Sequence, residues 1–123
     1  MSDEEDVLEA NQRFYAAFTN RDFAAMDGLW AAMAPVSCVH PGWMTLHGRS
    51  EVLNSWAAII SNPGQPRVIP GAATADIHGE LAIVHCREFV AGTPLVATNI
   101  FVREGGEWRM LHHHSSPVAM APD

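Results

Sequence analysis

The chain has 123 residues, of which 48% are hydrophobic, and it carries a formal net charge of −7. This length suits one domain with a single hydrophobic core, and we take residues 1–123 as that domain. An acidic chain lacks the basic surface that nucleic acids and anionic membranes require, so neither is an expected partner. All seven Lys/Arg positions are arginine, which excludes a Schiff-base lysine from this chain.

The two cysteines, Cys38 and Cys86, lack the paired spacing of a metal site. We expect them to be reduced, buried core residues. The sequence shows no leader pattern and no apolar run long enough to span a membrane, which predicts a cytoplasmic protein.

Three helices are expected in the first half of the chain. The first covers about residues 3–20: Ser2 is a suitable N-cap, acidic residues fill the first turn, and apolar residues recur at helical spacing. Asp22 is expected to cap a second helix that ends near Pro35. A third helix is expected over residues 52–60.

The remainder of the chain is expected to form strands. Two short extended segments lie between the second and third helices, and four longer strands follow the third. The expected segments are residues 36–40, 43–47, 67–77, 81–90, 95–103 and 108–117. Helices followed by a run of antiparallel strands predict the α+β class.

The last strand carries three consecutive histidines. Successive side chains of a strand point to opposite faces. One face is therefore expected to hold Trp108, Met110, His112, His114 and Ser116, and the other Arg109, Leu111, His113 and Ser115. The first face begins apolar and ends in two imidazoles and a hydroxyl group, as expected of a pocket wall. His113 is then expected on the outer face of the sheet.

Five short motifs accompany this order of elements. They are Phe18-Thr19-Asn20-Arg21-Asp22, His40-Pro41, Gly48-Arg49, Thr98-Asn99-Ile100-Phe101 and Gly106-Glu107-Trp108-Arg109. Together they resemble the SnoaL-like branch of the nuclear transport factor 2-like superfamily. The resemblance implies three N-terminal helices packed in the concave face of a strongly curved, antiparallel or mixed sheet, as a cone with a central pocket. It also implies a homodimer formed through the outer face of the sheet.

The resemblance allows a comparison with ketosteroid isomerase, which uses an aspartate base, a tyrosine and a protonated aspartate. By similarity the base falls at His40, the tyrosine at Phe14, and the second aspartate at or next to Thr98. None of the three is retained, and phenylalanine cannot donate a hydrogen bond, so steroid isomerisation by that mechanism is not expected. The imidazole of His40 can still carry a proton near neutral pH.

The histidines allow three hypotheses. In acid–base catalysis His40 abstracts a proton, and His112 or His114 holds an oxygen atom. In a metal site the same three histidines bind an ion such as zinc. In the third hypothesis they only satisfy each other's hydrogen bonds. Six residues are candidates for ligand contact: Trp43, Trp30, Trp56, Phe14, Asn99 and Ser116.

The sequence therefore predicts a domain that binds a small hydrophobic or aromatic molecule. If it is an enzyme, the expected reaction is an isomerisation, cyclisation or dehydration that needs proton transfer and no organic cofactor. The alternatives are a non-catalytic ligand-binding or assembly module and a histidine-ligated metal enzyme. Glu88, an acid within a predicted strand, is not assigned to either face of the sheet, and Tyr15 need not face the pocket.

Overall fold

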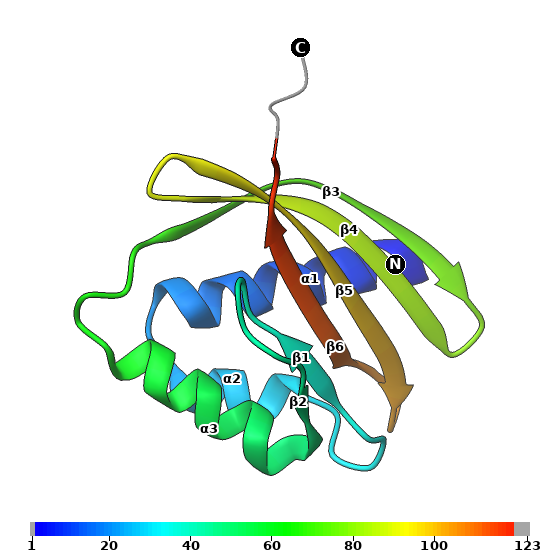
Figure 1. The fold of residues 1–123 in the computed structure, drawn as a ribbon. Helices are drawn as coiled ribbons and strands as arrows, with labels where there is room; N and C mark the ends of the chain where they lie inside the picture. Colours follow the sequence, from blue (N-terminus) through cyan, green and yellow to red (C-terminus); the bar gives the residue numbers. More distant parts are fainter. Residues whose placement is uncertain (1, 120–123) are drawn as a thin grey trace.

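The computed structural model describes residues 2–119. These residues form three helices and six strands (Figure 1), which are α1 (Asp3–Thr19), α2 (Phe23–Leu29), β1 (Ser37–Val39), β2 (Leu46–His47), α3 (Gly48–Ser61), β3 (Val68–His78), β4 (Leu81–Val90), β5 (Thr93–Glu104) and β6 (Glu107–Pro117). The strands form one sheet in the order β2-β1-β6-β5-β4-β3. Neighbouring strands are antiparallel except β1 and β6, which are parallel. The predicted α+β class with a mixed sheet is confirmed.

The helix α1 begins as the sequence predicts. The Ser2 hydroxyl oxygen accepts a hydrogen bond from the Glu5 backbone N–H at 3.1 Å, and the Glu5 carboxylate accepts one from the Ser2 backbone N–H at 3.2 Å. This reciprocal pair is a capping box, which satisfies two N–H groups at the helix start. Val7, Ala10 and Phe14 then form a fully buried face of the helix. No helix of the described residues has both the length and the hydropathy needed to cross a membrane.

The second helix is shorter than predicted. Asp22 caps it as expected, but the helix ends at Leu29 instead of continuing toward Pro35. The cause is Glu104 of β5, whose carboxylate accepts the backbone N–H groups of residues 32–34 at distances between 2.8 and 3.1 Å. These N–H groups therefore need no helical carbonyl partner, and the segment is held as a loop against the sheet.

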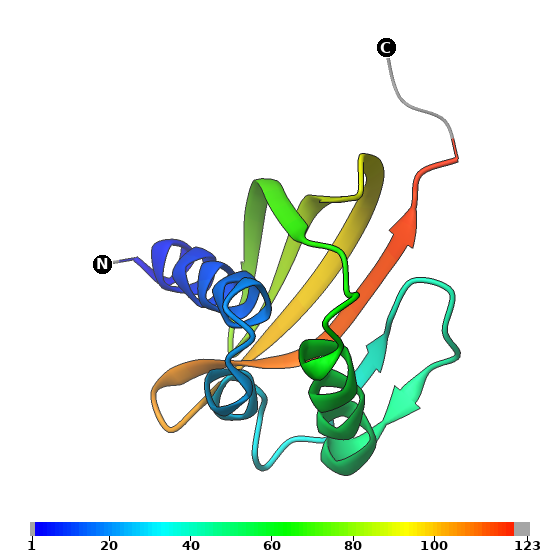
Figure 2. The same cartoon turned by 90° about the vertical axis from the view of Figure 1, so that its left-hand side faces the viewer.

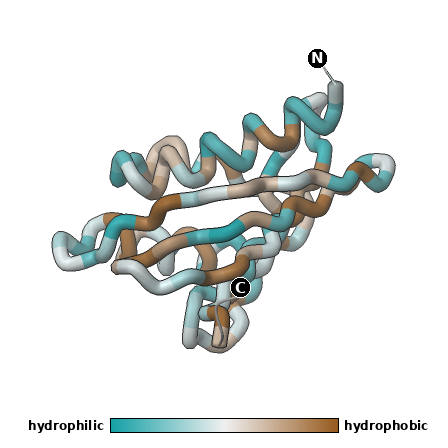
Figure 3. The backbone as a smooth tube through the Cα atoms, turned by 90° about the horizontal axis from the view of Figure 1, so that it is seen from above, coloured by the Kyte–Doolittle hydropathy of each residue, from teal (hydrophilic) through white to brown (hydrophobic). Residues whose placement is uncertain are grey.

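The sheet bends around the first helix. Figure 2 views α1 and α3 close to their axes, with the long strands curving past them. The helix α1 packs against β3 and also contacts β4 and β6, while α3 contacts β1 and β2. Figure 3 shows hydrophobic and hydrophilic residues interspersed along α1 and along the strands, as expected of elements with one buried face. The buried faces meet in one continuous hydrophobic core.

A β-bulge between β5 and β6 changes the face to which the histidines point. Phe101 pairs with Met110 but Ile100 pairs with His112, so Leu111 is an extra residue without a partner. An extra residue reverses the alternation of side chains beyond it. Trp108 and Met110 are buried, and after the bulge the buried residues of β6 are His113 and Ser115 instead of His112 and His114. The predicted faces of this strand are correct before Leu111 and wrong after it.

Candidate functional site

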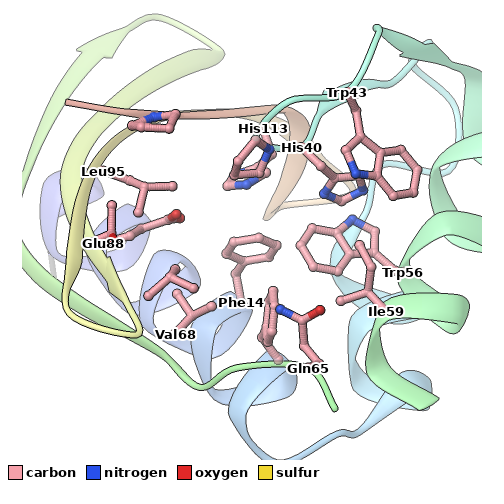
Figure 4. Close-up of a pocket in the computed structure, with 15 residues that line it drawn as sticks. Phe14, His40, Trp43, Trp56, Ile59, Gln65, Val68, Glu88, Leu95 and His113 are labelled. Carbon is pink, nitrogen blue, oxygen red and sulfur yellow. The ribbon is translucent and has the colours of Figure 1, made fainter. Parts of the chain in front are cut away.

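A cavity of about 390 Å³ lies among α1, α3 and the concave face of the sheet. This volume lies in the range of small-molecule binding sites. Its apolar wall includes Phe14, Phe18, Trp56, Ile59, Val68 and Leu95. Its polar lining residues are His40, Gln65, Glu88, Thr93 and His113. Figure 4 shows His40 and His113 next to each other, with Glu88 on another part of the wall beside Leu95.

His113 is held in one orientation by Asn99, which is completely buried beneath it. The His113 Nδ1 atom lies 2.5 Å from Asn99 Oδ1. The amide nitrogen of Asn99 donates to Asn11 Oδ1 at 2.8 Å, so Asn99 Oδ1 is an acceptor and His113 Nδ1–H donates to it. The other ring nitrogen, Nε2, then carries the lone pair, and it has no hydrogen-bond partner among residues 2–119. His113 therefore presents an acceptor atom to the cavity.

Burial keeps His113 uncharged. The ring is 3% exposed, and its removal from water, with further contributions from His40, His112 and His114, lowers its pKa to about 3. A buried cation without an opposite charge is unfavourable, so the neutral form is retained at physiological pH.

Glu88 is held by two hydroxyl groups. The Tyr15 hydroxyl donates to Glu88 Oε2 at 2.5 Å, and the Ser115 hydroxyl donates to Glu88 Oε1 at 2.6 Å. The Tyr15 oxygen in turn accepts a hydrogen bond from the Asn99 amide at 3.2 Å. Burial and the charge of Glu88 raise the pKa of Tyr15, so the phenol keeps its proton. A continuous buried network therefore connects His113 to Glu88 behind the cavity wall.

His40 follows β1 and lies on the same wall. Its Nε2 atom is 2.8 Å from the Ser55 hydroxyl, which itself donates to the Val52 carbonyl at 2.6 Å. The Ser55 oxygen therefore accepts the His40 Nε2–H, and Nδ1 carries the lone pair. Burial lowers the pKa of His40 to about 4. Its ring centroid lies 4.7 Å from that of Trp56 and 6.4 Å from that of His113.

Two of the three histidines predicted for catalysis lie outside the cavity. His112 faces the opposite side of the sheet, where its Nδ1 atom is 2.7 Å from the Ser37 hydroxyl, and His114 is exposed beside it. Burial and the neighbouring His114 lower the pKa of His112. The expectation that both point into the pocket is wrong, and the reason is the bulge at Leu111. His40, His112 and His114 therefore do not assemble as the predicted metal site, and no group of three or more His, Cys, Asp or Glu side chains within residues 2–119 is arranged to hold an ion.

The six predicted ligand-contact residues divide into two groups. Phe14, Trp43 and Trp56 line the cavity, with Trp43 at its exposed rim. The other three do not line it. Trp30 is 1% exposed within the core, Asn99 lies behind His113, and Ser116 is on the outer side of the sheet because of the bulge.

The predicted set lacks both buried acid–base groups, Glu88 and His113, and the two hydroxyl partners of Glu88, Tyr15 and Ser115. One of them has a clear sequence signal. Ala82, Val84 and Cys86 are buried at alternate positions of β4, and Glu88 continues the same period. That pattern places Glu88 on the inner face. His113 and Ser115 carry no comparable signal, because the bulge is not marked by glycine or proline.

The cysteines are core residues, as expected. Both are buried and free. Burial raises the pKa of Cys38 to about 12 and also raises that of Cys86. Thiols that keep their protons are poor nucleophiles, which agrees with a packing role.

The family model of the SnoaL-like domain matches residues 7–121, nearly the whole chain. This chain belongs to the SnoaL-like domain family. The domain is similar to a candidate dehydratase of the nuclear transport factor 2-like family from Streptomyces avermitilis, with 36% identity and a TM-score of 0.89 over 96% of this chain and 97% of that one. It is also similar to a candidate association domain of calcium/calmodulin-dependent protein kinase type II from Thiobacillus denitrificans, with 32% identity and a TM-score of 0.78 over 89% and 92% of the two chains.

The SnoaL-like domain is also similar to part of a plant protein. It is 30% identical over 113 residues to the F-box protein SKIP8 of Arabidopsis thaliana. The match covers 89% of this chain and 48% of that protein, so the chain spans about half the length of this curated relative.

The positions compared with ketosteroid isomerase lie at the cavity of this SnoaL-like domain. Phe14 and His40 line it, and Asn99, next to Thr98, supports His113 from behind. The domain thus has polar side chains at two of these positions, His40 and Asn99, and an apolar one at Phe14.

Proposed function

We propose that this SnoaL-like domain binds a small, largely apolar molecule in its cavity and acts on it by proton transfer. The reaction would be of the isomerase, cyclase or dehydratase type and would need no organic cofactor. One observation carries the proposal: an apolar cavity wall holds two buried acid–base groups, His113 and Glu88, that are fixed by a continuous hydrogen-bond network. The likeness to the candidate dehydratase from Streptomyces avermitilis supports this reaction class.

The two groups would have different roles. Glu88 would accept and return the proton, because a carboxylate fixed by the Tyr15 and Ser115 hydroxyls still has free lone pairs. His113 would accept a hydrogen bond from a hydroxyl group of the bound molecule through Nε2, since burial keeps the ring neutral. His40 would be a second acceptor through Nδ1. In this proposal Glu88 takes the proton-transfer role first given to His40, and His113 takes the oxygen-binding role first given to His112 or His114.

The proposal is tested with 2-tetralone, a small bicyclic ketone with exchangeable protons next to its carbonyl group. Incorporation of deuterium from D₂O is followed by NMR with and without the protein. We expect acceleration by the wild type and a loss of about a hundredfold in Glu88→Gln, since the amide cannot accept the proton. The control His114→Gln, on the outer face, should leave the exchange unchanged. His113→Gln should also leave it largely unchanged, because this ketone has no hydroxyl group to donate to His113 Nε2. If 2-tetralone binds but its exchange is not accelerated, proton-transfer catalysis on this probe is contradicted and a binding module is favoured.

A second candidate function is assembly, and it is favoured by the 32% identity to the candidate association domain from Thiobacillus denitrificans. The outer face of the sheet exposes apolar side chains such as Val96, which is 51% exposed, and Phe89, which is 39% exposed. A homodimer through this face would cover them. We expect Val96→Asp to shift a dimer to monomer in light scattering, while Met44→Asp, at an exposed position in the loop before β2, should not. A wild-type monomer would contradict this assignment.

A further inference from the structure

A second hollow of about 360 Å³ adjoins the cavity. It lies where the ends of α1 and α3 meet the segment that leads into β3. The cavity and this second hollow share four lining residues, namely Phe18, Ile59, Gln65 and Val68. The cavity and the hollow are therefore adjacent, with these four residues at their boundary.

The charges of the two spaces differ. The second hollow is lined by Arg21 and Arg67 and by no acidic residue, whereas Glu88 lines the cavity only. Three other arginines of this acidic chain form ion pairs with carboxylates. Within residues 2–119, neither Arg21 nor Arg67 has such a partner. We call this hollow the arginine groove, defined by Arg21 and Arg67.

The Arg21 guanidinium group is held in place by the end of α3. Its Nη1 atom donates to the Ile60 carbonyl at 3.0 Å and to the Asn62 carbonyl at 2.8 Å. Arginine has five N–H donors, so Nη2 and Nε remain available in a fixed orientation. Arg67 is exposed immediately before β3 and adds a second positive charge. Two such groups suit an acceptor with several oxygen atoms, such as a carboxylate or a sulfonate.

We infer that the molecule taken by this cavity is an amphiphile, whose apolar body fills the cavity and whose anionic end lies in the arginine groove. The anionic end would be a carboxylate, sulfonate or phosphate group. Glu88 favours this orientation, because it repels an anion from the wall of the cavity while the two arginines attract it in the groove. The inference rests on ligand binding as proposed above and not on catalysis.

The test uses two fluorescent probes that share an apolar body. The first, 8-anilinonaphthalene-1-sulfonate, is anionic, and the second, N-phenyl-1-naphthylamine, lacks the sulfonate. Both are titrated into the wild type, Arg67→Gln and the control Arg87→Gln, whose side chain is exposed on β4 away from the groove. Arg21→Gln is a second variant, and circular dichroism checks its folding because Arg21 also holds the end of α3.

We expect Arg67→Gln to weaken binding of the sulfonate probe about threefold, as is typical of losing an exposed ion pair. Binding of the neutral probe should be unchanged. Raising the salt concentration from about 50 mM to about 500 mM should weaken binding of the sulfonate probe to the wild type. The effect on Arg67→Gln should be smaller. Equal effects of Arg67→Gln and Arg87→Gln would overturn the inference. If both probes bind with equal affinity, the inference of an anionic end in the arginine groove fails but the proposed ligand binding stands. If neither probe binds, the proposed ligand binding fails with it.

Discussion

Replacing Asn99 tests the network that orients His113. Asn99→Leu keeps the approximate size of the side chain but removes the acceptor of the His113 Nδ1–H and the donor to Asn11 Oδ1, together with the longer contact to the Tyr15 oxygen. Because position 99 is completely buried, water cannot replace either partner. A buried polar group left unpaired costs about 1–3 kcal/mol, so the two together should cost about 3 kcal/mol of the free energy of unfolding. For a domain of this size the loss corresponds to a decrease in Tm of about 12 °C.

The assay is urea unfolding monitored by circular dichroism at neutral pH. Thr98→Val is the matched control, since the neighbouring residue faces the other side of the sheet and should stay within about 0.5 kcal/mol of the wild type. Asn99→Asp separates the loss of stability from the loss of the hydrogen bond that orients the His113 ring. A carboxylate still accepts the His113 N–H and should raise the pKa of that ring, as followed by NMR titration. An Asn99→Leu variant as stable as Thr98→Val would refute the network.

Two further predictions concern acid. Lowering the pH from about 7 to about 5 should cost about 2 kcal/mol of the free energy of unfolding for each of His40 and His113. Burial holds both pKa values below the ordinary 6.5, so only the unfolded chain gains protons in this window. Equal stability in urea titrations at the two pH values would contradict this. Glu104→Gln should destabilise the protein by about 1 kcal/mol near pH 7 because three backbone N–H groups lose a charged acceptor. These N–H groups lower the pKa of Glu104, so its contribution is present above the ordinary value of 4.5 and lost on acidification. The deficit of the variant should therefore shrink near pH 4, and a constant deficit in thermal unfolding would count against this reasoning.

Local sequence signals determined most of the secondary structure. The caps at Ser2 and Asp22 and the helical spacing of apolar residues gave the starts of the first two helices correctly. Alternating apolar residues gave the long strands to within a few residues. These signals work because they depend on neighbours in the chain, such as an N–H group three residues from its acceptor. The end of α2 was predicted incorrectly because its cause, Glu104, lies about 70 residues away.

The sequence alone also predicted a site with histidine, tryptophan and phenylalanine, but only the tertiary structure decided which histidines belong to it. The single extra residue at Leu111 turns His113 and Ser115 inward and His112 and His114 outward. A strand read in isolation has a period of two and gives no sign of such a shift, because a bulge exists only relative to the strand paired with it. In the same way, the partners that hold His113 and Glu88 come from α1, β5 and β6, and only the folding of the sheet around α1 brings them within hydrogen-bonding distance.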